Sequence, residues 1–270
     1  MNYCLYRKLS ALMSIREMFM HKKKYEISYD KYIIIDEDLG IHLEDHGVYK
    51  KIPSDIYSCL NNPLYETKVD KNCKLEKIFS LEEGVRNGIA LELYDTGAVY
   101  WQGYYKKGVL HGPSRYFTKE GNILSVTWFF DGNEQGESYQ YYMSSKVASV
   151  THYKDGKMHG LQQFFYENGA LKSTMNYQNG IIDGDVVLYF KDGKVKRKCS
   201  FSEGKKQGVD IIFGENQIVL DEGMYHQGNP CGIHTRRYDS GKLKEQICYS
   251  SNNTCSKKVW DEFGELVIGG

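Results

Sequence analysis

The sequence predicts a mainly β fold: an elongated array of antiparallel β-hairpins in a single-layer twisted sheet, preceded by a short N-terminal helix. Three observations lead to this prediction. Two glycines recur with a period of 24 residues, residues of strand-forming type alternate between them, and short turn sequences separate the apolar runs. A regular period of this length marks supersecondary units that stack on their neighbours.

Each unit begins at a first glycine, and a second glycine follows four places later. The first glycines are Gly84, Gly108, Gly132, Gly156, Gly180, Gly204 and Gly228. The second glycines are Gly88, Gly112, Gly136, Gly160, Gly184, Gly208 and Gly232. We assign a structural role in turns to all of them, because glycine adopts positive φ at no steric cost and allows close approach of another backbone.

Residues 1–30 form a basic amphipathic segment ahead of the array. Apolar residues recur near helical spacing at Leu5, Leu9, Leu12 and Phe19, and a basic cluster follows at Lys22, Lys23 and Lys24. The pattern predicts a helix that caps the first hairpin. A helix that touches anionic lipid or a partner, and a disordered leader, are the alternatives. Arg16 and Glu17 interrupt the apolar run that a signal peptide needs.

Residues 31–83 carry the period more faintly, and we interpret them as degenerate repeats or an N-terminal cap. Tyr57 and Leu81 fall on the aromatic position of the unit, and Leu75 on the aliphatic position. The His42–His46 spacing would suit a pair of metal ligands, but the sequence offers no evident third ligand, so no metal site is expected.

Residues 84–250 are the repeat array proper. In the unit that begins at Gly156, Asn168-Gly169 predicts a hairpin turn in which both central residues have positive φ. Leu171, Ser173, Met175 and Tyr177 should then share one face of the second strand. Ser145 and Gln217 replace the glycine of this turn in their units, which predicts altered turns there.

Residues 251–270 look like a degenerate capping repeat. Asn252 and Ser256 stand where the two glycines are expected, while Tyr249 and Val267 keep the apolar markers. A final unit that departs from the repeat pattern is usual in repeat arrays, because one side of the last repeat faces water.

Three segments, YKDGKMHGLQQFFYENGALKS, YQNGIIDGDVVLYFKDGKVKR and YHQGNPCGIHTRRYDSGKLKE, resemble the bacterial variant of the MORN repeat. The resemblance covers about residues 79–250. It implies an interaction protein without catalytic residues, and bacterial members are often described as antitoxin-like, as in the YwqK group. Eukaryotic relatives are attached to lipid kinases, membrane-junction proteins and a histone methyltransferase, none of whose catalytic domains is similar to this chain.

Composition is that of a cytoplasmic protein that is either free or peripheral to a membrane. The 35 basic and 35 acidic residues balance, so no global field favours nucleic acid, and no nucleic-acid partner is expected. The seven cysteines are odd in number and form no CxxC pair, which favours free thiols in a reducing compartment over a disulfide framework or a zinc site.

Catalytic motifs are absent from the sequence, and we expect neither enzyme activity nor a cofactor. His111 and His159 each precede a second glycine, and a role in the turn is the simplest interpretation. An unrecognised active site in the first 80 residues is the remaining enzymatic alternative.

Two sets of residues are candidates for binding. Trp101, Tyr104 and Trp128 form an aromatic group that could contact a partner protein, with core packing as the alternative; at most one of the two tryptophans need face outward. Lys196, Arg197 and Lys198, together with Lys22, Lys23 and Lys24, could bind an anionic ligand or lipid, with a solvated face as the alternative.

The expected function is therefore a non-catalytic protein–protein interaction scaffold or adaptor, with an antitoxin-like role as one version of it. The alternative is a membrane-associated adaptor that binds anionic phospholipid through its basic segments. The sequence names no partner.

Overall fold

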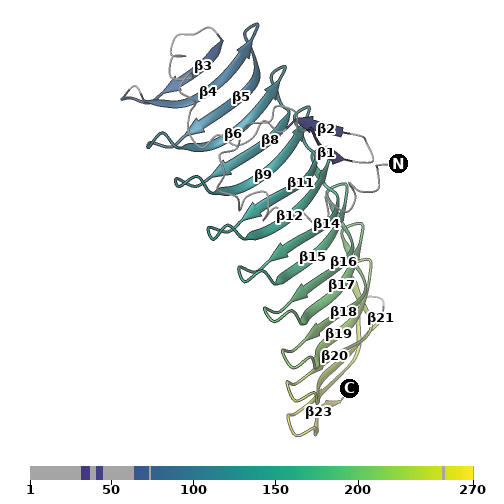
Figure 1. The fold of residues 1–270 in the computed structure, drawn as a ribbon. Helices are drawn as coiled ribbons and strands as arrows, with labels where there is room; N and C mark the ends of the chain where they lie inside the picture. The colour runs from purple at the N-terminus through teal and green to yellow at the C-terminus, as the bar shows by residue number, and fades with distance from the viewer. Residues whose placement is uncertain (1–31, 37–40, 45–63, 73, 251–252, 270) are drawn as a thin grey trace, which may run out of the picture. The chain divides into compact units, whose positions relative to one another are not determined.

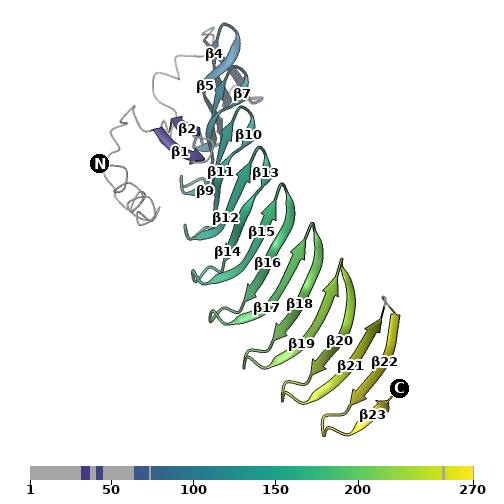
Figure 2. The same ribbon diagram turned by 90° about the vertical axis from the view of Figure 1, so that its right-hand side faces the viewer.

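The computed structural model describes residues 32–36, 41–44, 64–72, 74–250 and 253–269. In these residues all regular structure is β-strand. The predicted helix in residues 1–30 and the triplet Lys22, Lys23 and Lys24 lie outside the described residues. Strands β1 (Tyr32–Asp36) and β2 (Ile41–Glu44) pair with each other as a separate two-stranded antiparallel sheet, drawn in purple in Figure 2.

The other strands form one antiparallel sheet of 21 strands, which confirms the mainly β prediction. Figure 1 shows these strands side by side in chain order. Their bounds are β3 (Tyr65–Val69), β4 (Leu75–Glu82), β5 (Val85–Leu93), β6 (Val99–Lys106), β7 (Val109–Leu110), β8 (Gly112–Phe117), β9 (Ile123–Phe130), β10 (Asn133–Glu134), β11 (Gly136–Tyr141), β12 (Val147–Lys154), β13 (Lys157–Met158), β14 (Gly160–Phe165), β15 (Leu171–Gln178), β16 (Ile181–Tyr189), β17 (Val195–Ser202), β18 (Lys205–Phe213), β19 (Val219–His226), β20 (Asn229–Arg237), β21 (Leu243–Ser250), β22 (Asn253–Trp260) and β23 (Leu266–Gly269).

The first glycine of each unit closes a two-residue hairpin. At Asn179-Gly180, for example, φ is 53° at the asparagine and 84° at the glycine, and Gln178 pairs with Ile181 across the turn. Two successive positive φ angles define a type I′ turn, whose twist matches that of the flanking strands. The residue before the first glycine has positive φ in all seven units, so the 24-residue period reflects a recurring turn geometry.

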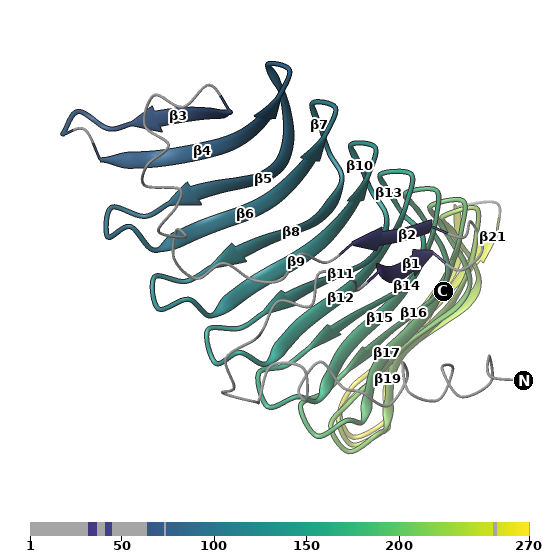
Figure 3. The same ribbon diagram turned by 45° about the horizontal axis from the view of Figure 1, so that its top comes forward.

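The turn at Asn168-Gly169 differs from the sequence prediction. Only Gly169 has positive φ, at 89°; its N–H donates to the carbonyl of Tyr166, and the N–H of Tyr166 donates to the carbonyl of Ala170. This is a type I turn that ends in a left-handed residue and a bulge. The prediction of positive φ at both residues was therefore wrong for Asn168. The two kinds of turn lie at opposite ends of the strands, as Figure 3 shows for β4 to β9.

Ser145 and Gln217 keep this turn in spite of the missing glycine. Their φ angles are 62° and 63°, and the N–H of Ser145 donates to the carbonyl of Tyr142 as the N–H of Gly169 does to Tyr166. The turns of these units are therefore not altered. They keep the ordinary hydrogen bonds, and the residue that replaces glycine is strained.

Hydrogen bonds between units hold the array in register. The N–H of Gly156 donates to the carbonyl of Glu134, and that of Gly180 to the carbonyl of Met158, at 2.9 and 2.8 Å. At the other end of the strands, the hydroxyl of Tyr166 donates to the carbonyl of Tyr189 at 2.8 Å. Because each unit satisfies polar groups of the next, a unit is stable only beside its neighbours.

The best-packed part of the sheet is β4 to β9. Ile78, Leu91, Val99 and Phe117 form one buried cluster, each no more than 1% exposed. On the other face Phe79, Ala90 and Trp101 form a second buried cluster. Farther along the chain the positions equivalent to Trp101 and Ala90 hold serine and glutamine, namely Ser149, Ser173 and Gln162, which are also buried.

Candidate functional site

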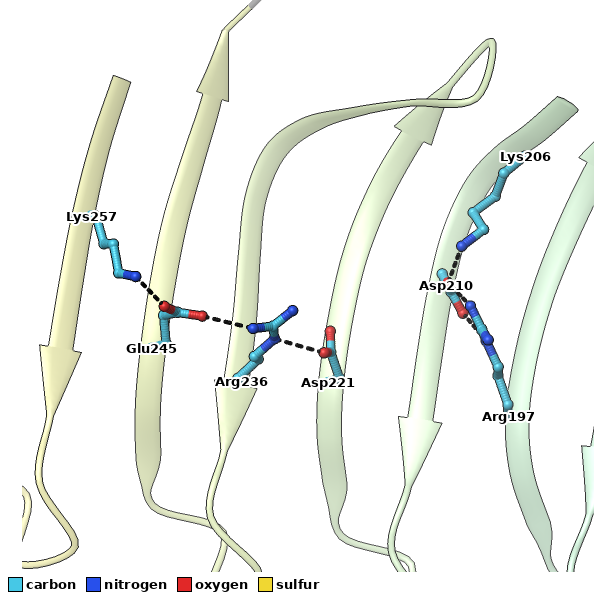
Figure 4. A network of polar contacts seen from close by, with 7 residues as sticks. All are labelled: Arg197, Lys206, Asp210, Asp221, Arg236, Glu245 and Lys257. Carbon is cyan, nitrogen blue, oxygen red and sulfur yellow. Dashed lines mark hydrogen bonds and ion pairs between the residues drawn. The ribbon is translucent and has the colours of Figure 1, made fainter. Parts of the chain in front are cut away.

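The candidate site is one face of strands β17 to β22, which we call the Arg197 face. It carries Arg197, Lys206, Asp210, Asp221, Arg236, Glu245 and Lys257, all drawn in Figure 4. The register places them together, because Asp221 pairs with Arg236 and Arg236 with Glu245 on adjacent strands. Directly opposed residues of an antiparallel pair point to the same face of a sheet.

Two groups of ion pairs cross this face. Lys257 Nζ lies 2.6 Å from Glu245 Oε1, Glu245 Oε2 lies 3.1 Å from Arg236 Nη1, and Arg236 Nε lies 2.9 Å from Asp221 Oδ2. In the second group Asp210 accepts from Arg197 at both oxygens and from Lys206 Nζ at 2.6 Å. Figure 4 shows the two groups side by side over consecutive strands.

Asp210 is the most buried of these charges, with a side chain only 8% exposed. Burial alone would raise the pKa of its carboxyl, but the hydrogen bonds from Arg197 and Lys206 outweigh burial and hold the pKa below its ordinary value of 3.8. The hydrogen bond from Lys257 likewise lowers the pKa of Glu245. Both groups are therefore carboxylates at neutral pH.

An aromatic group lies beside the ion pairs. The His234 ring packs between Tyr225 and Tyr249, with centroid distances of 5.1 and 4.8 Å, and its Nε2–H donates to the carbonyl of Met224. Lys206 Nζ lies 4.2 Å from the centroid of Tyr225. Gly223 leaves the space for the imidazole, because a Cβ at that position would clash with His234 Nδ1.

These residues line a hollow of about 190 Å³. Its walls are charged at Arg197, Asp210, Asp221, Arg236 and Glu245, aromatic at Tyr225, His234 and Tyr249, and apolar at Ile212, Pro230 and Ile247. Pockets that enclose whole small molecules are commonly about 300–1,000 Å³. The hollow is thus smaller than such pockets.

Among the predicted binding residues that the structure describes, Arg197 alone belongs to this face. It does not act as a free cation of a basic cluster, because Asp210 engages its guanidinium at 2.8 and 2.6 Å. Lys196 and Lys198 are exposed and point to the opposite face of β17, which we call the Lys198 face. The structure therefore divides the predicted triplet between two faces.

Trp101, Tyr104 and Trp128 are all buried, with exposures of 6%, 6% and 9%. Register places Trp101 and Trp128 on opposite faces of the sheet, and Trp101 Nε1–H donates to Ser114 Oγ at 2.7 Å. Burial at these positions favours core packing, the alternative interpretation of this aromatic group. In β4 to β9 side chains are buried on both faces of the sheet. A period-two sequence pattern alone does not reveal whether one face or both faces are buried.

His111 and His159 take part in turns, as expected. The Nδ1 atoms of these residues accept the N–H of Asp131 and Asn179 in the following unit, at 3.3 and 3.5 Å. Gln135 does the same for Asp155 at 2.9 Å. The side chain at this position accepts the N–H of a residue with positive φ in the next unit. Any side chain with a suitable acceptor can do this, which is why both histidine and glutamine occur there.

Metal ligands were not expected, and the part of the chain that the structure describes holds no group of three or more His, Cys, Asp or Glu that could bind a metal. His42 lies in β2, and His46 falls outside the described residues. The same described ranges contain no helix long and apolar enough for a membrane span.

Sequence reasoning missed the Arg197 face, although a signal for it exists. The seventeenth place after the first glycine is serine in three consecutive units, at Ser125, Ser149 and Ser173. In the last three units it is Arg197, Asp221 and Glu245. A change from small to charged residues at an inward position, confined to one end of an array, indicates a specialised surface.

Comparison with known proteins supports the assignment of the repeat type and no assignment of function. The comparison with curated proteins gave no match. Among solved structures, TarM is similar at 16% identity and a TM-score of 0.25, over 49% of this chain and 25% of that one. The GtfA/B complex bound to UDP and GlcNAc has 14% identity and a TM-score of 0.19, over 59% and 28%.

The accessory secretory protein 1,2 and 3 structure from Streptococcus pneumoniae has 15% identity and a TM-score of 0.16, over 53% and 22% of the two chains. This chain thus spans about a quarter of the structures it matches, and similarities at this level carry no argument about function.

The family model described as "MORN repeat variant" matches residues 158–179, 182–203 and 230–251. These segments begin 24 and 48 residues apart (182 − 158 and 230 − 182), so they share the period of the glycines. The first two span β13 to β17, and the third spans β20 and β21. The chain is a protein with MORN repeats of the variant type, which the family model identifies at these three positions.

Proposed function

We propose that this chain is a non-catalytic protein-interaction scaffold or adaptor, and that the Arg197 face contacts the partner protein. The observation that carries the proposal is the set of paired charges across β17 to β22 beside the hollow lined by Tyr225, His234 and Tyr249. MORN repeats are commonly protein- or membrane-binding repeats, which agrees with an interaction role.

Preorganisation favours this face as a binding surface. The charged side chains already hold one another in place, so a partner that meets them loses little side-chain entropy of theirs. Arg236 is 60% exposed and therefore remains available while it pairs with Asp221 and Glu245. Arginine and tyrosine are the residue types that supply most binding energy at protein interfaces.

The state of the acids favours binding over catalysis. A general acid or base works best when its pKa lies near the operating pH. Asp210 and Glu245 have pKa values below their ordinary ones and are engaged by Arg197, Lys206, Arg236 and Lys257. Such carboxylates can fix the position of a cation but hold no proton to transfer at neutral pH.

The expected partner presents both charges and a large side chain to fill the hollow. Because this face carries both basic and acidic side chains, the complementary surface is a polypeptide of mixed charge. In the antitoxin-like version of this proposal, a toxin encoded beside this chain is the partner.

The test begins with affinity capture of partners by the full chain and identification by mass spectrometry. Affinity is then measured for the exchanged pair Arg236→Glu with Glu245→Arg, which keeps opposite charges on these two strands but reverses the charges shown to a partner. Circular dichroism checks that this variant keeps its fold, because the exchange also sets like charges against Asp221 and Lys257. A loss of at least about tenfold, or 1.4 kcal/mol, is expected.

The matched control exchanges Lys119 and Asp95, an exposed pair at the turns that follow β8 and β5, 3.1 Å apart. It should bind as the parent does. Equal binding by parent, exchanged pair and control would remove the Arg197 face from the proposal. Flotation of the parent with anionic liposomes, lost when Lys196 and Lys198 become Glu, would favour the membrane adaptor instead.

A further inference from the structure

Cys248 and Cys255 oppose each other in the last full hairpin of the sheet. Cys248 pairs with Ser256 and Tyr249 pairs with Thr254 across β21 and β22, so Cys255 is an extra residue in β22. In a β-bulge of this kind two residues of one strand oppose a single residue of the other. Cys255 and Ser256 together therefore oppose Cys248 across the two strands.

This pair differs from the other cysteines that the structure describes. Cys199 is buried, at 3% exposure, and burial raises the pKa of its thiol. Cys231 pairs across β19 and β20 with Met224, which cannot form a disulfide. Cys255 is exposed and Cys248 is partly exposed, so small oxidants reach both.

The two thiols have unequal roles. Interaction with Cys255 raises the pKa of the Cys248 thiol, whereas the greater exposure of Cys255 favours it as the first nucleophile. The exposed Cys255 is then the sulfur that an incoming reagent meets first. Cys248, held beside it by the bulge, is placed to react second.

We propose that Cys248 and Cys255 are a redox site, which closes to a disulfide by exchange with a low-molecular-weight disulfide such as glutathione disulfide. The thiolate of Cys255 attacks one sulfur of glutathione disulfide and releases one glutathione thiolate, giving a mixed disulfide. The thiolate of Cys248 attacks the Cys255 sulfur and releases the second glutathione. Two protein thiols are oxidised, one glutathione disulfide is reduced to two thiols, and two protons pass from the cysteines to the released thiolates.

The site lies apart from the proposed interaction surface. Cys248 is on the Lys198 face, because it stands two residues after Gln246, whereas Glu245 and Ile247 point to the Arg197 face. Closure of the disulfide joins β21 to β22 without replacing any ion pair of the Arg197 face. Failure of the proposed function would therefore leave this inference intact, and the reverse also holds.

The test uses the full chain, with glutathione disulfide as the probe. After incubation the free thiols are counted, and digested peptides are mapped by mass spectrometry. The parent should lose two of its seven thiols and give one peptide pair linked through Cys248 and Cys255, which dithiothreitol reverses. Cys248→Ser should accumulate glutathione on Cys255, and the control Cys231→Ser should behave as the parent does.

Serine is close to cysteine in size and both positions reach solvent, so these variants should fold, which circular dichroism checks. The inference is overturned if Cys248 and Cys255 in the parent each carry glutathione, if both stay reduced, or if the linked peptides contain other cysteines.

Discussion

Arg197 and Asp210 form a bidentate ion pair across β17 and β18, with Nε 2.8 Å from Oδ1 and Nη2 2.6 Å from Oδ2. Lys206 completes the group from the same strand as Asp210. The guanidinium fork matches the geometry of a carboxylate, and the hydrogen bond to Asp210 raises the pKa of Arg197. This triad is the most buried part of the Arg197 face, so it should contribute to stability as well as to the surface.

Asp210→Asn should lower the free energy of unfolding by about 2 kcal/mol, because Arg197 and Lys206 both lose their partner in a largely dry position. Arg197→Met should cost less, since Lys206 still pairs with Asp210. Urea unfolding of the two single variants and the double variant measures the coupling. The same cycle on Lys68 and Glu76, an exposed pair 3.5 Å apart, serves as control and should show no coupling. Equal coupling in the two cycles would contradict the structural role of the triad.

A second prediction concerns His152 and pH. His152 Nε2 lies 3.0 Å from Glu137 Oε1, and Nδ1 lies 2.6 Å from the carbonyl of Leu161; since both ring nitrogens face acceptors, the protonated imidazolium can donate to both. The hydrogen bond with Glu137 raises the pKa of His152 above 6.5 and lowers the pKa of Glu137 below 4.5. Stabilisation by His152 is complete below pH 6.5 and is lost as pH rises through the raised pKa.

For Glu137 the sign is opposite: its contribution is present above pH 4.5 and is lost as pH falls through the lowered pKa. The pair therefore stabilises most between these values. Both side chains are more than a third exposed, so solvent screening should limit the effect to less than about 1 kcal/mol. Unfolding free energies of the parent between pH 5 and 9 should decline more than those of His152→Gln. Parallel curves would show that the contact does not persist in solution.

The third prediction concerns the first-glycine turns. Gly156→Val and Gly180→Val should each lower the free energy of unfolding by about 1–3 kcal/mol, because φ is 74° and 84° and a β-branched residue is strained there. A Cβ at either position meets other atoms no closer than 3.5 Å, so the cost comes from conformation and not from crowding. Gly156→Asn should lower the free energy of unfolding much less, because asparagine tolerates positive φ. Thermal melts that match the parent in both valine variants would contradict this.

Ser145 gives the fourth prediction, in the stabilising direction. It holds φ at 62° in the turn where most other units have glycine. Ser145→Gly relieves left-handed strain and should raise the free energy of unfolding by about 1 kcal/mol. Ser144→Gly is the matched control and should not stabilise. A lower melting temperature for Ser145→Gly would mean that the serine side chain contributes more than its backbone costs.

Sequence alone determined the architecture of this protein. Regular glycines and period-two patterning predicted antiparallel hairpins, and the structure confirms one antiparallel sheet, because turn geometry and strand alternation are local properties. The turn role of His111 and His159 could be predicted for a similar reason. Each contacts a residue one unit away, and that spacing repeats along the array.

Tertiary structure alone decided which side chains reach solvent and which meet. Tryptophan is a residue type that is common at binding surfaces. Trp101 and Trp128 are nevertheless buried, because side chains pack on both faces of β4 to β9. Asp210, Asp221 and Arg236 are separated along the chain, and only the register of β17 to β22 aligns them beside the hollow. Burial and cross-strand alignment depend on the sum of many pairings, which no single unit of 24 residues contains.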